Sequence, residues 1–371
     1  MLEKGKINGR QFTVLVIMFT TGSSLLLAPS MLSSEAKQDA WLAAILGVVV
    51  GGLLAWLYQS LGNLYSDMTL VEYSEKILGK WIGKAVSLLF FTFAFLLAAL
   101  VLRNIGDFIT TQFMPETPIQ SIHIIFLIIV MMGTRHGLET IARSGEILFP
   151  LFIVFFLLLV LLTSPQIEVE KIQPILEDGI NPILRSTLLF IGFPFLELVI
   201  FLMIFPYVNK PKEAGKALFM GTWMGGVILI LLTALAILVE GPDYTSRNLY
   251  PSFYLAQKIN IGNFLQRIEA IVAIMWFIAI YYKLTICFYV SALSLAQILN
   301  LKEYRMLVFP LGMILIVLSI VISPNIVYLV SIIIDIWTTY ALTFGLFLPL
   351  LLLGIVAVRR YVKPIGDDKE G

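Results

Sequence analysis

Charged residues, cysteine and histidine are all scarce in this sequence, and each scarcity excludes a class of protein. Asp, Glu, Lys and Arg make up 13% of the 371 residues, while 59% of the residues are hydrophobic. A soluble domain carries about 25% charge, so water cannot be the solvent for much of this surface. The net charge of +1 gives no reason to expect a nucleic-acid partner, because such partners select basic surfaces.

The single cysteine, Cys287, cannot form an intrachain disulfide or a cysteine-based metal site. The two histidines, His123 and His136, lie far apart in sequence. The sequence contains no phosphate-binding glycine loop, nucleophile triad or metal-ligand spacing. We therefore expect no metal, no cofactor and no catalytic residue, in a protein that is not an enzyme.

Long apolar runs recur from one end of the chain to the other. A membrane-spanning helix needs roughly 20 mostly apolar residues. Ten runs meet or approach that length, at about 11–32, 39–61, 83–108, 119–134, 146–163, 184–207, 214–239, 264–297, 305–322 and 327–358. No polar linker divides them, so we predict one all-α transmembrane domain, residues 1–371, with about ten transmembrane helices in the lipid bilayer. Residues 243–262 are predicted to form an external loop with short interfacial helices.

The distribution of Lys and Arg among the loops predicts the orientation, because cytoplasmic loops are enriched in these residues. With the N-terminus inside, 17 of the 25 Lys and Arg fall in cytoplasmic segments and five fall outside. The remaining three, Arg103, Arg267 and Lys283, lie in or at the edge of the runs. An even number of spans then places both termini in the cytoplasm.

Two of the ten runs are interrupted by helix-breaking residues at corresponding places. The first run contains residues 20–24 (TTGSS), and the sixth contains residues 191–194 (IGFP). Proline removes a helix donor and glycine loosens the backbone. Both are common in membrane helices, but breaks in spans one and six of ten are what a five-plus-five inverted repeat predicts. We therefore predict a LeuT-like architecture, with repeat one at about 11–163 and repeat two at about 184–358.

The two breaks predict a ligand site between them. A break inside the membrane frees backbone groups that lipid cannot satisfy, and the N-terminus of a half-helix suits a ligand carboxylate. The amides freed at Gly22, Ser23 and Ser24 are expected to face that ligand. The candidate ligand-binding residues are Thr21, Gly22, Ser23, Ser24, Gly192, Phe193, Pro194 and Glu197. Close helix packing through small residues is the alternative interpretation of the first break.

Charged residues inside the spans are the other candidates for function. Glu197 follows the second break, and a charge at that depth needs a ligand ammonium or a basic side chain as its partner. Lys283 lies near the middle of the eighth run. Its ammonium could replace a bound sodium between the first and eighth helices, or pair with Glu197 or Asp335, or titrate, or extend to an interface. Arg103 and Asp107, four residues apart, are expected to form a structural or gating pair, with ligand contact as the alternative.

Several segments, in order along nearly the whole chain, resemble one family. They are residues 39–42 (DAWL), 79–83 (GKWIG), 102–109 (LRNIGDFI), 117–118 (TP), 137–146 (GLETIARSGE) with Pro150, 194–197 (PFLE) and 267–270 (RIEA). Together they resemble the spore germination permease family, the B subunits of GerA-type nutrient germinant receptors, within the amino acid–polyamine–cation superfamily. The ligand residues of that family vary, so the positions of the breaks carry over better than the side chains that select the ligand.

The resemblance implies a germinant receptor subunit in the spore inner membrane. Such a subunit binds a small nutrient, an amino acid, and signals germination with an A subunit and a lipoprotein C subunit. Two other functions remain open from the residues themselves. One is an amino acid transporter of the same fold, coupled to H⁺ or Na⁺. The other is a channel or scaffold that binds no small solute.

Overall fold

A computed structural model of the chain describes residues 2–3, 5–258 and 269–362. Within these residues every element is a helix, apart from an isolated bridge between Ile7 and Val208. The elements are, in order, α1 (Gly9–Thr21), α2 (Ser24–Ala36), η1 (Lys37–Asp39), α3 (Ala40–Leu64), α4 (Leu70–Leu78), α5 (Lys80–Gln112), α6 (Ile119–His136), α7 (Leu138–Thr163), η2 (Ser164–Gln166), η3 (Val169–Ile172), α8 (Asn181–Phe190), η4 (Ile191–Phe195), η5 (Leu196–Met203), η6 (Phe205–Tyr207), α9 (Pro211–Glu240), α10 (Pro242–Arg247), α11 (Pro251–Gln257), α12 (Glu269–Ile298), α13 (Arg305–Val321), α14 (Ile326–Ser331), η7 (Ile332–Trp337), α15 (Thr338–Leu342), η8 (Thr343–Phe347) and α16 (Leu348–Val362).

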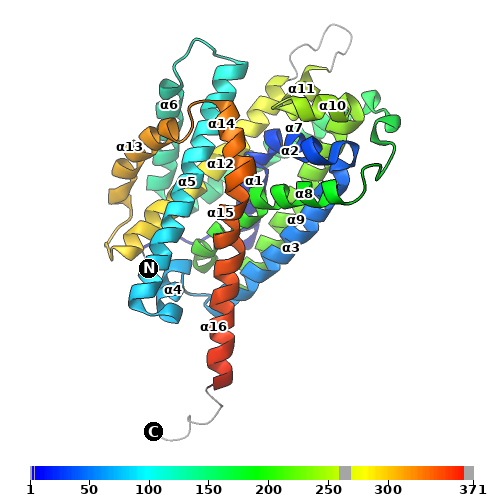
Figure 1. Ribbon diagram of the computed structural model, residues 1–371. Coiled ribbons are helices and arrows are strands. Elements are labelled where there is room, and N and C mark those ends of the chain that lie inside the picture. The colour runs from blue at the N-terminus through cyan, green and yellow to red at the C-terminus, as the bar shows by residue number, and fades with distance from the viewer. Residues whose placement is uncertain (1, 4, 259–268, 363–371) are drawn as a thin grey trace, which may run out of the picture.

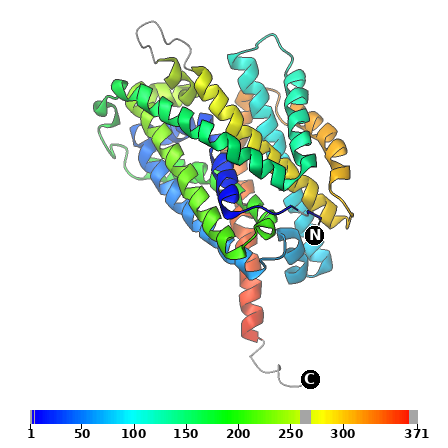
Figure 2. The ribbon, with the colours of Figure 1, turned by 180° about the vertical axis from the view of Figure 1, so that it is seen from behind.

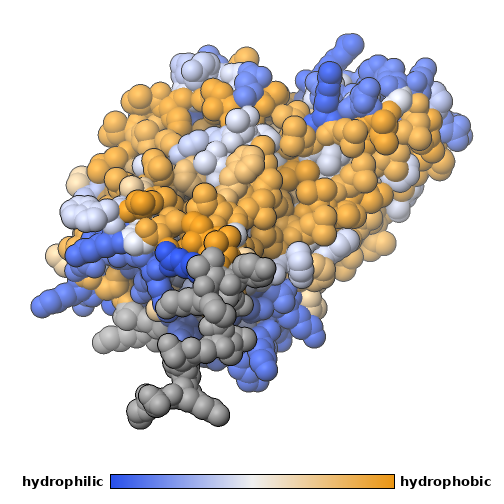
Figure 3. All heavy atoms as spheres, turned by 60° about the horizontal axis from the view of Figure 1, so that its bottom comes forward, coloured by the Kyte–Doolittle hydropathy of each residue, from blue (hydrophilic) through white to orange (hydrophobic). Residues whose placement is uncertain are grey.

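The chain is a multi-pass membrane protein. Eight stretches of the described residues are long and apolar enough to cross a membrane. One of them, Ser24–Leu64, contains the C-terminal part of the first predicted run and all of the second, and the 17-residue α13 corresponds to the ninth. Figure 3 shows the apolar belt that these helices present between two hydrophilic ends. The segment 264–268 of the eighth predicted run and Arg267 lie outside the described residues.

Both predicted breaks are present, and they give the first and sixth spans two halves each. α1 ends at Thr21 and α2 begins at Ser24. In the sixth span, α8 is followed by the π-helical turn η4, inside which Phe193 has φ −145° and ψ 79°. The second half, η5, is a 3-10 helix, whose hydrogen-bond geometry is poorer than that of an α-helix. The fold therefore places two weak points of the backbone inside the bundle.

Short segments cover the broken first span at both ends. Toward one end, α10 and α11 pack on α2, and Ser252 Oγ of α11 donates to the Leu25 carbonyl at 2.7 Å. These are the short helices predicted within 243–262, of which residues 259–262 lie outside the described part. Toward the other end, Ile7 exchanges backbone hydrogen bonds with Tyr207 and Asn209, each at 2.9 Å. Figure 2 shows α1 running within the bundle and α16 projecting below it.

Candidate functional site

The two breaks meet at the centre of the bundle and enclose a small cavity. Ser24 Oγ lies 3.5 Å from the Phe193 carbonyl, so the break of the first span touches that of the sixth. The cavity beside this contact is lined by Ser23, Leu27, Leu97, Leu100, Val101, Asn104, Phe193, Glu197, Ile333 and Trp337. The centre of a water molecule can occupy only about 10 Å³ of it, which is room for about one water. The structure is therefore a closed state.

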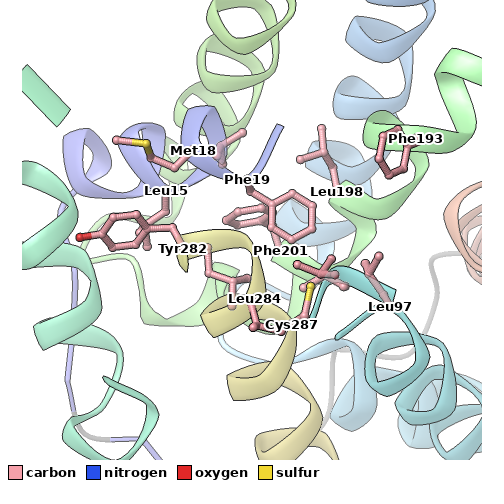
Figure 4. Close-up of a cluster of buried hydrophobic side chains, with 14 of the residues drawn as sticks. Leu15, Met18, Phe19, Leu97, Phe193, Leu198, Phe201, Tyr282, Leu284 and Cys287 are labelled. Atoms are coloured by element: carbon pink, nitrogen blue, oxygen red, sulfur yellow. The ribbon is translucent and has the colours of Figure 1, made fainter. Parts of the chain in front are cut away.

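Lys283 of α12 reaches both breaks. Its Nζ lies 2.7 Å from Oε2 of Glu197, and both side chains are fully buried. The same ammonium lies over the rings of Phe19 and Phe193, 5.2 and 4.7 Å from their centroids. Figure 4 shows Phe19 of α1 among buried side chains of α12, such as Leu284, and of η5, such as Phe201. One cation thus contacts the first, sixth and eighth spans.

Both oxygens of Glu197 are occupied. Oε1 accepts a hydrogen bond from Nε1 of Trp337 at 2.8 Å, and Oε2 faces the Lys283 ammonium. That second contact lies outside hydrogen-bond geometry, so it is an ion pair rather than an aligned hydrogen bond. Of the partners expected from the sequence for Glu197, the structure shows the basic side chain, and the two buried charges sum to zero.

Gly22 lies against the stem of the Lys283 side chain. A Cβ at Gly22 would stand 2.7 Å from Cδ and 2.8 Å from Cβ of Lys283. The Gly22 amide donates to the Met18 carbonyl at 2.9 Å, so the expectation that this amide is free was wrong. Helix α2 opens with amides that have no partner within the helix, and the first of its amides bonded to a carbonyl is that of Leu27. The open donors are therefore those at the start of α2.

The remaining residues predicted at the breaks pack around the cavity. Thr21 Oγ1 donates to the carbonyls of Ile17 and Met18, within α1. Gly192 approaches the tenth span so closely that a Cβ there would meet Thr338 Oγ1 at 2.4 Å. Pro194 is buried in η4. Of the eight candidate residues, Ser23, Phe193 and Glu197 line the cavity, and the other five do not.

Asn104 is a cavity residue that the sequence reasoning missed. Its side chain is 2% exposed, and neither Oδ1 nor Nδ2 has a hydrogen-bond partner. A buried amide without a hydrogen-bond partner is unfavourable, so a partner that hydrogen-bonds to this amide from the cavity would stabilise it. Spacing could have found it, because residues 97, 100, 101 and 104 lie on one helix face and all four line the cavity. Asn104 is the amide on that otherwise apolar face.

Arg103 and Asp107 form the predicted pair away from the cavity lining. Nε of Arg103 lies 2.9 Å from Oδ2 of Asp107, and both are buried. The Arg103 guanidinium also donates to the Ser323 carbonyl, just before the tenth span. The pair therefore ties α5 to the start of that span, one residue from Asn104.

Of the two carboxylates left open as partners of Lys283, the structure shows Glu197 and not Asp335. Ile333 and Trp337 point into the cavity, and Asp335 lies between them in sequence. On a helix, a residue two positions from each of them faces the opposite side. Asp335 is accordingly exposed on the outer surface of the tenth span.

The known proteins whose sequences resemble this chain are spore germination proteins. A profile of the family described as spore germination protein matches residues 6–327. The chain is 32% identical over 327 residues to spore germination protein KB of Bacillus subtilis (strain 168), covering 87% of each chain. It is 28% identical over 303 residues to spore germination protein YndE of the same strain, covering 80% of this chain and 82% of the relative.

Solved transporter structures share the fold at low sequence identity. MhsT in complex with L-phenylalanine has a TM-score of 0.66 at 14% identity, over 95% of this chain and 99% of MhsT. A Na⁺-coupled sialic acid symporter has a TM-score of 0.68 at 11% identity, over 96% of this chain and 90% of the symporter. The fold is therefore LeuT-like, as predicted. The chain belongs to the spore germination protein family.

Proposed function

We propose that this chain is the B subunit of a nutrient germinant receptor, and that it binds an amino acid between the broken first and sixth spans. It acts in the spore inner membrane, with both termini in the cytoplasm, and signals germination together with A and C subunits. It does so by binding rather than as an enzyme. The observation that carries the proposal is the cavity at the junction of the two breaks, with its unpartnered Asn104 amide.

The cavity chemistry supports a ligand without net charge. Lys283 and Glu197 neutralise each other, so a ligand of net charge would remain uncompensated in a buried site, at considerable cost. The charges of an amino acid zwitterion match these groups, because its carboxylate can accept hydrogen bonds from the amides that open α2. Its ammonium can donate to Oδ1 of Asn104. Leu97, Leu100 and Val101 then offer an apolar wall to a small apolar side chain.

The closed geometry supports signalling. An amino acid does not fit in room for about one water, so the ligand must bind a wider state. A ligand shifts a conformational equilibrium only by its differential affinity for the two states. The affinities of the two states differ here because the closed state excludes the ligand sterically. Nutrient binding would thus favour separation of the α1–α2 and η4–η5 segments, and that change would reach the partner subunits.

An amino acid transporter coupled to H⁺ or Na⁺ is the second candidate, and the likeness to a Na⁺-coupled symporter favours it. The Lys283 ammonium, which contacts the first, sixth and eighth spans, supports sodium independence. Uptake of labelled amino acid into vesicles containing only this chain separates the two functions. A receptor subunit would bind the amino acid without accumulating it, whereas a transporter would accumulate the amino acid inside the vesicles, driven by an ion gradient.

The test of the receptor function uses spores that lack the native gene and carry either the native chain or Asn104→Leu. The native chain should restore germination to one or more neutral amino acids. Asn104→Leu should raise the concentration needed for half response at least about tenfold, equivalent to about 1.4 kcal/mol. An exposed control on the same helix, Leu88→Ala, should respond like the native chain. An unchanged response of Asn104→Leu would refute the site.

A further inference from the structure

A carboxylate faces the membrane interior on the outer surface of the tenth span. Asp335 lies in η7 at the level of the cavity, because Ile333 and Trp337 of the same element line that cavity. Exposed residues one and two turns further on are Thr339 and Thr343, spaced four apart along one face. We call Asp335, Thr339 and Thr343 the Asp335 face. Figure 1 shows the tenth span running down the near side of the bundle with no helix in front of it.

This position is unfavourable for a chain alone in lipid. In the part of the chain that the structure describes, no basic side chain lies within ion-pair distance of Asp335. An ionised carboxylate facing hydrocarbon is costly, and such residues nearly always face a protein partner or a water-filled path. Polar residues on helix surfaces in membranes commonly hydrogen-bond to a neighbouring helix. The Asp335 face therefore has the character of half of a helix–helix interface.

The negative charge of Asp335 indicates that the partner side of this interface carries a positive charge. We propose that the Asp335 face docks a membrane-spanning helix of a second protein, one that carries a lysine or arginine at mid-depth. A second copy of this chain is a poor match. Among the described residues, the basic side chains at this depth, Arg103 and Lys283, are both buried and already paired. The required cation comes from a different polypeptide.

The position of this face also links it to the cavity. Trp337 donates to Glu197, and Trp337 and Asp335 share one π-helical segment. Widening of the cavity would move Trp337, and with it the carboxylate that holds the partner. This inference deepens the proposed function, on which it rests, because it names the surface through which the nutrient site acts on a partner.

The test is photocrosslinking of the full chain in native spore membranes. A photoreactive residue replaces Thr339, next to Asp335, and a matched control replaces Ile128, an exposed residue of α6. The Thr339 probe should give an adduct with a membrane-spanning peptide of another protein that contains Lys or Arg. The Asp335→Leu substitution should reduce that adduct at least about tenfold, or about 1.4 kcal/mol, whereas Asp335→Glu should retain it. The Ile128 probe should give no such adduct.

Four results would overturn the inference. Adducts with lipid alone would mean that the carboxyl group faces hydrocarbon in its neutral form. An adduct with a second copy would assign the face to self-association. A partner peptide without a basic residue, or an adduct indifferent to Asp335→Leu, would remove the charge argument. Purified Asp335→Leu protein should bind the amino acid as the native chain does. If the native chain itself binds no amino acid, that result counts against the proposed function and not against the docking face.

Discussion

Separating the buried charges Lys283 and Glu197 is the perturbation whose energetics the structure defines most sharply. Both side chains are fully buried and 2.7 Å apart. Lys283→Met keeps the chain length and removes the ammonium, leaving Glu197 with the Trp337 hydrogen bond. Removing one partner of a buried ion pair typically destabilises a protein by about 3–5 kcal/mol. Replacing both charges with neutral groups of similar volume is often close to neutral.

The expected order of thermal stability follows from that difference. The native chain should be the most stable, or nearly so, and Lys283→Met the least. Adding Glu197→Gln to Lys283→Met should restore most of the loss. Lys283→Arg should be intermediate, because it keeps the charge but its planar guanidinium must fit where a Cβ on Gly22 would already collide.

The assay is thermal unfolding of the purified variants in one detergent, together with germination of spores carrying each variant. Lys302→Met, a substitution of an exposed lysine, is the matched control and should change stability by less than about 0.5 kcal/mol. Lys283→Met spores should lose their nutrient response. If Glu197→Gln fails to rescue Lys283→Met, so that the two effects simply add, the ion pair does not provide the coupling we ascribe to it.

Three further predictions concern the first break, the ion dependence and the topology. Gly22→Leu should destabilise the closed state by about 1–3 kcal/mol or more, because the new side chain overpacks against Lys283. The control is Gly354→Ala, in which no atom lies within 4 Å of the added Cβ, and it should not be destabilised. Thermal unfolding measures both variants, and equal effects would contradict the packing. Germination through the native chain should be the same in sodium and choline buffers, because the ammonium takes the place of a bound cation, and a strict sodium requirement would exclude that role. A cysteine replacing Lys212 should not react with an impermeant reagent added outside, whereas a cysteine replacing Lys37 should react. The native Cys287 is buried and should give no background labelling. Labelling at position 212 would mean that the orientation is inverted.

The sequence predicted the fold well because its strongest signals are local. Apolar runs give the spans by length, and Gly22 and Pro194 mark the breaks through backbone chemistry. Run lengths alone placed α7 too late. Gly137, with φ 93°, ends α6 and lets the next helix begin at Leu138, before its apolar stretch.

Side-chain partners were harder to predict because they depend on how each helix is rotated about its axis. Spans eight and ten are apolar on most faces, so periodicity could not tell whether Lys283 meets Glu197 or Asp335. The structure sets Glu197 inward and Asp335 outward. The place of Asn104 in the cavity lining depends in the same way on the rotation of α5, whereas the i,i+4 spacing of Arg103 and Asp107 predicts their pair directly. The 3-10 character of η5 has no clear signature in an all-apolar stretch.

Direct binding of an amino acid to the purified chain tests the central claim, that the nutrient site is the cavity between the two breaks. The measurement is saturation binding of a labelled amino acid that triggers germination, compared between the native chain and Val101→Trp, in which the indole fills the cavity. We predict saturable binding of one ligand per native chain and its loss in Val101→Trp, with thermal unfolding confirming that the variant is folded. Native-like binding by folded Val101→Trp would place the nutrient site elsewhere, and no binding by the native chain would contradict the account.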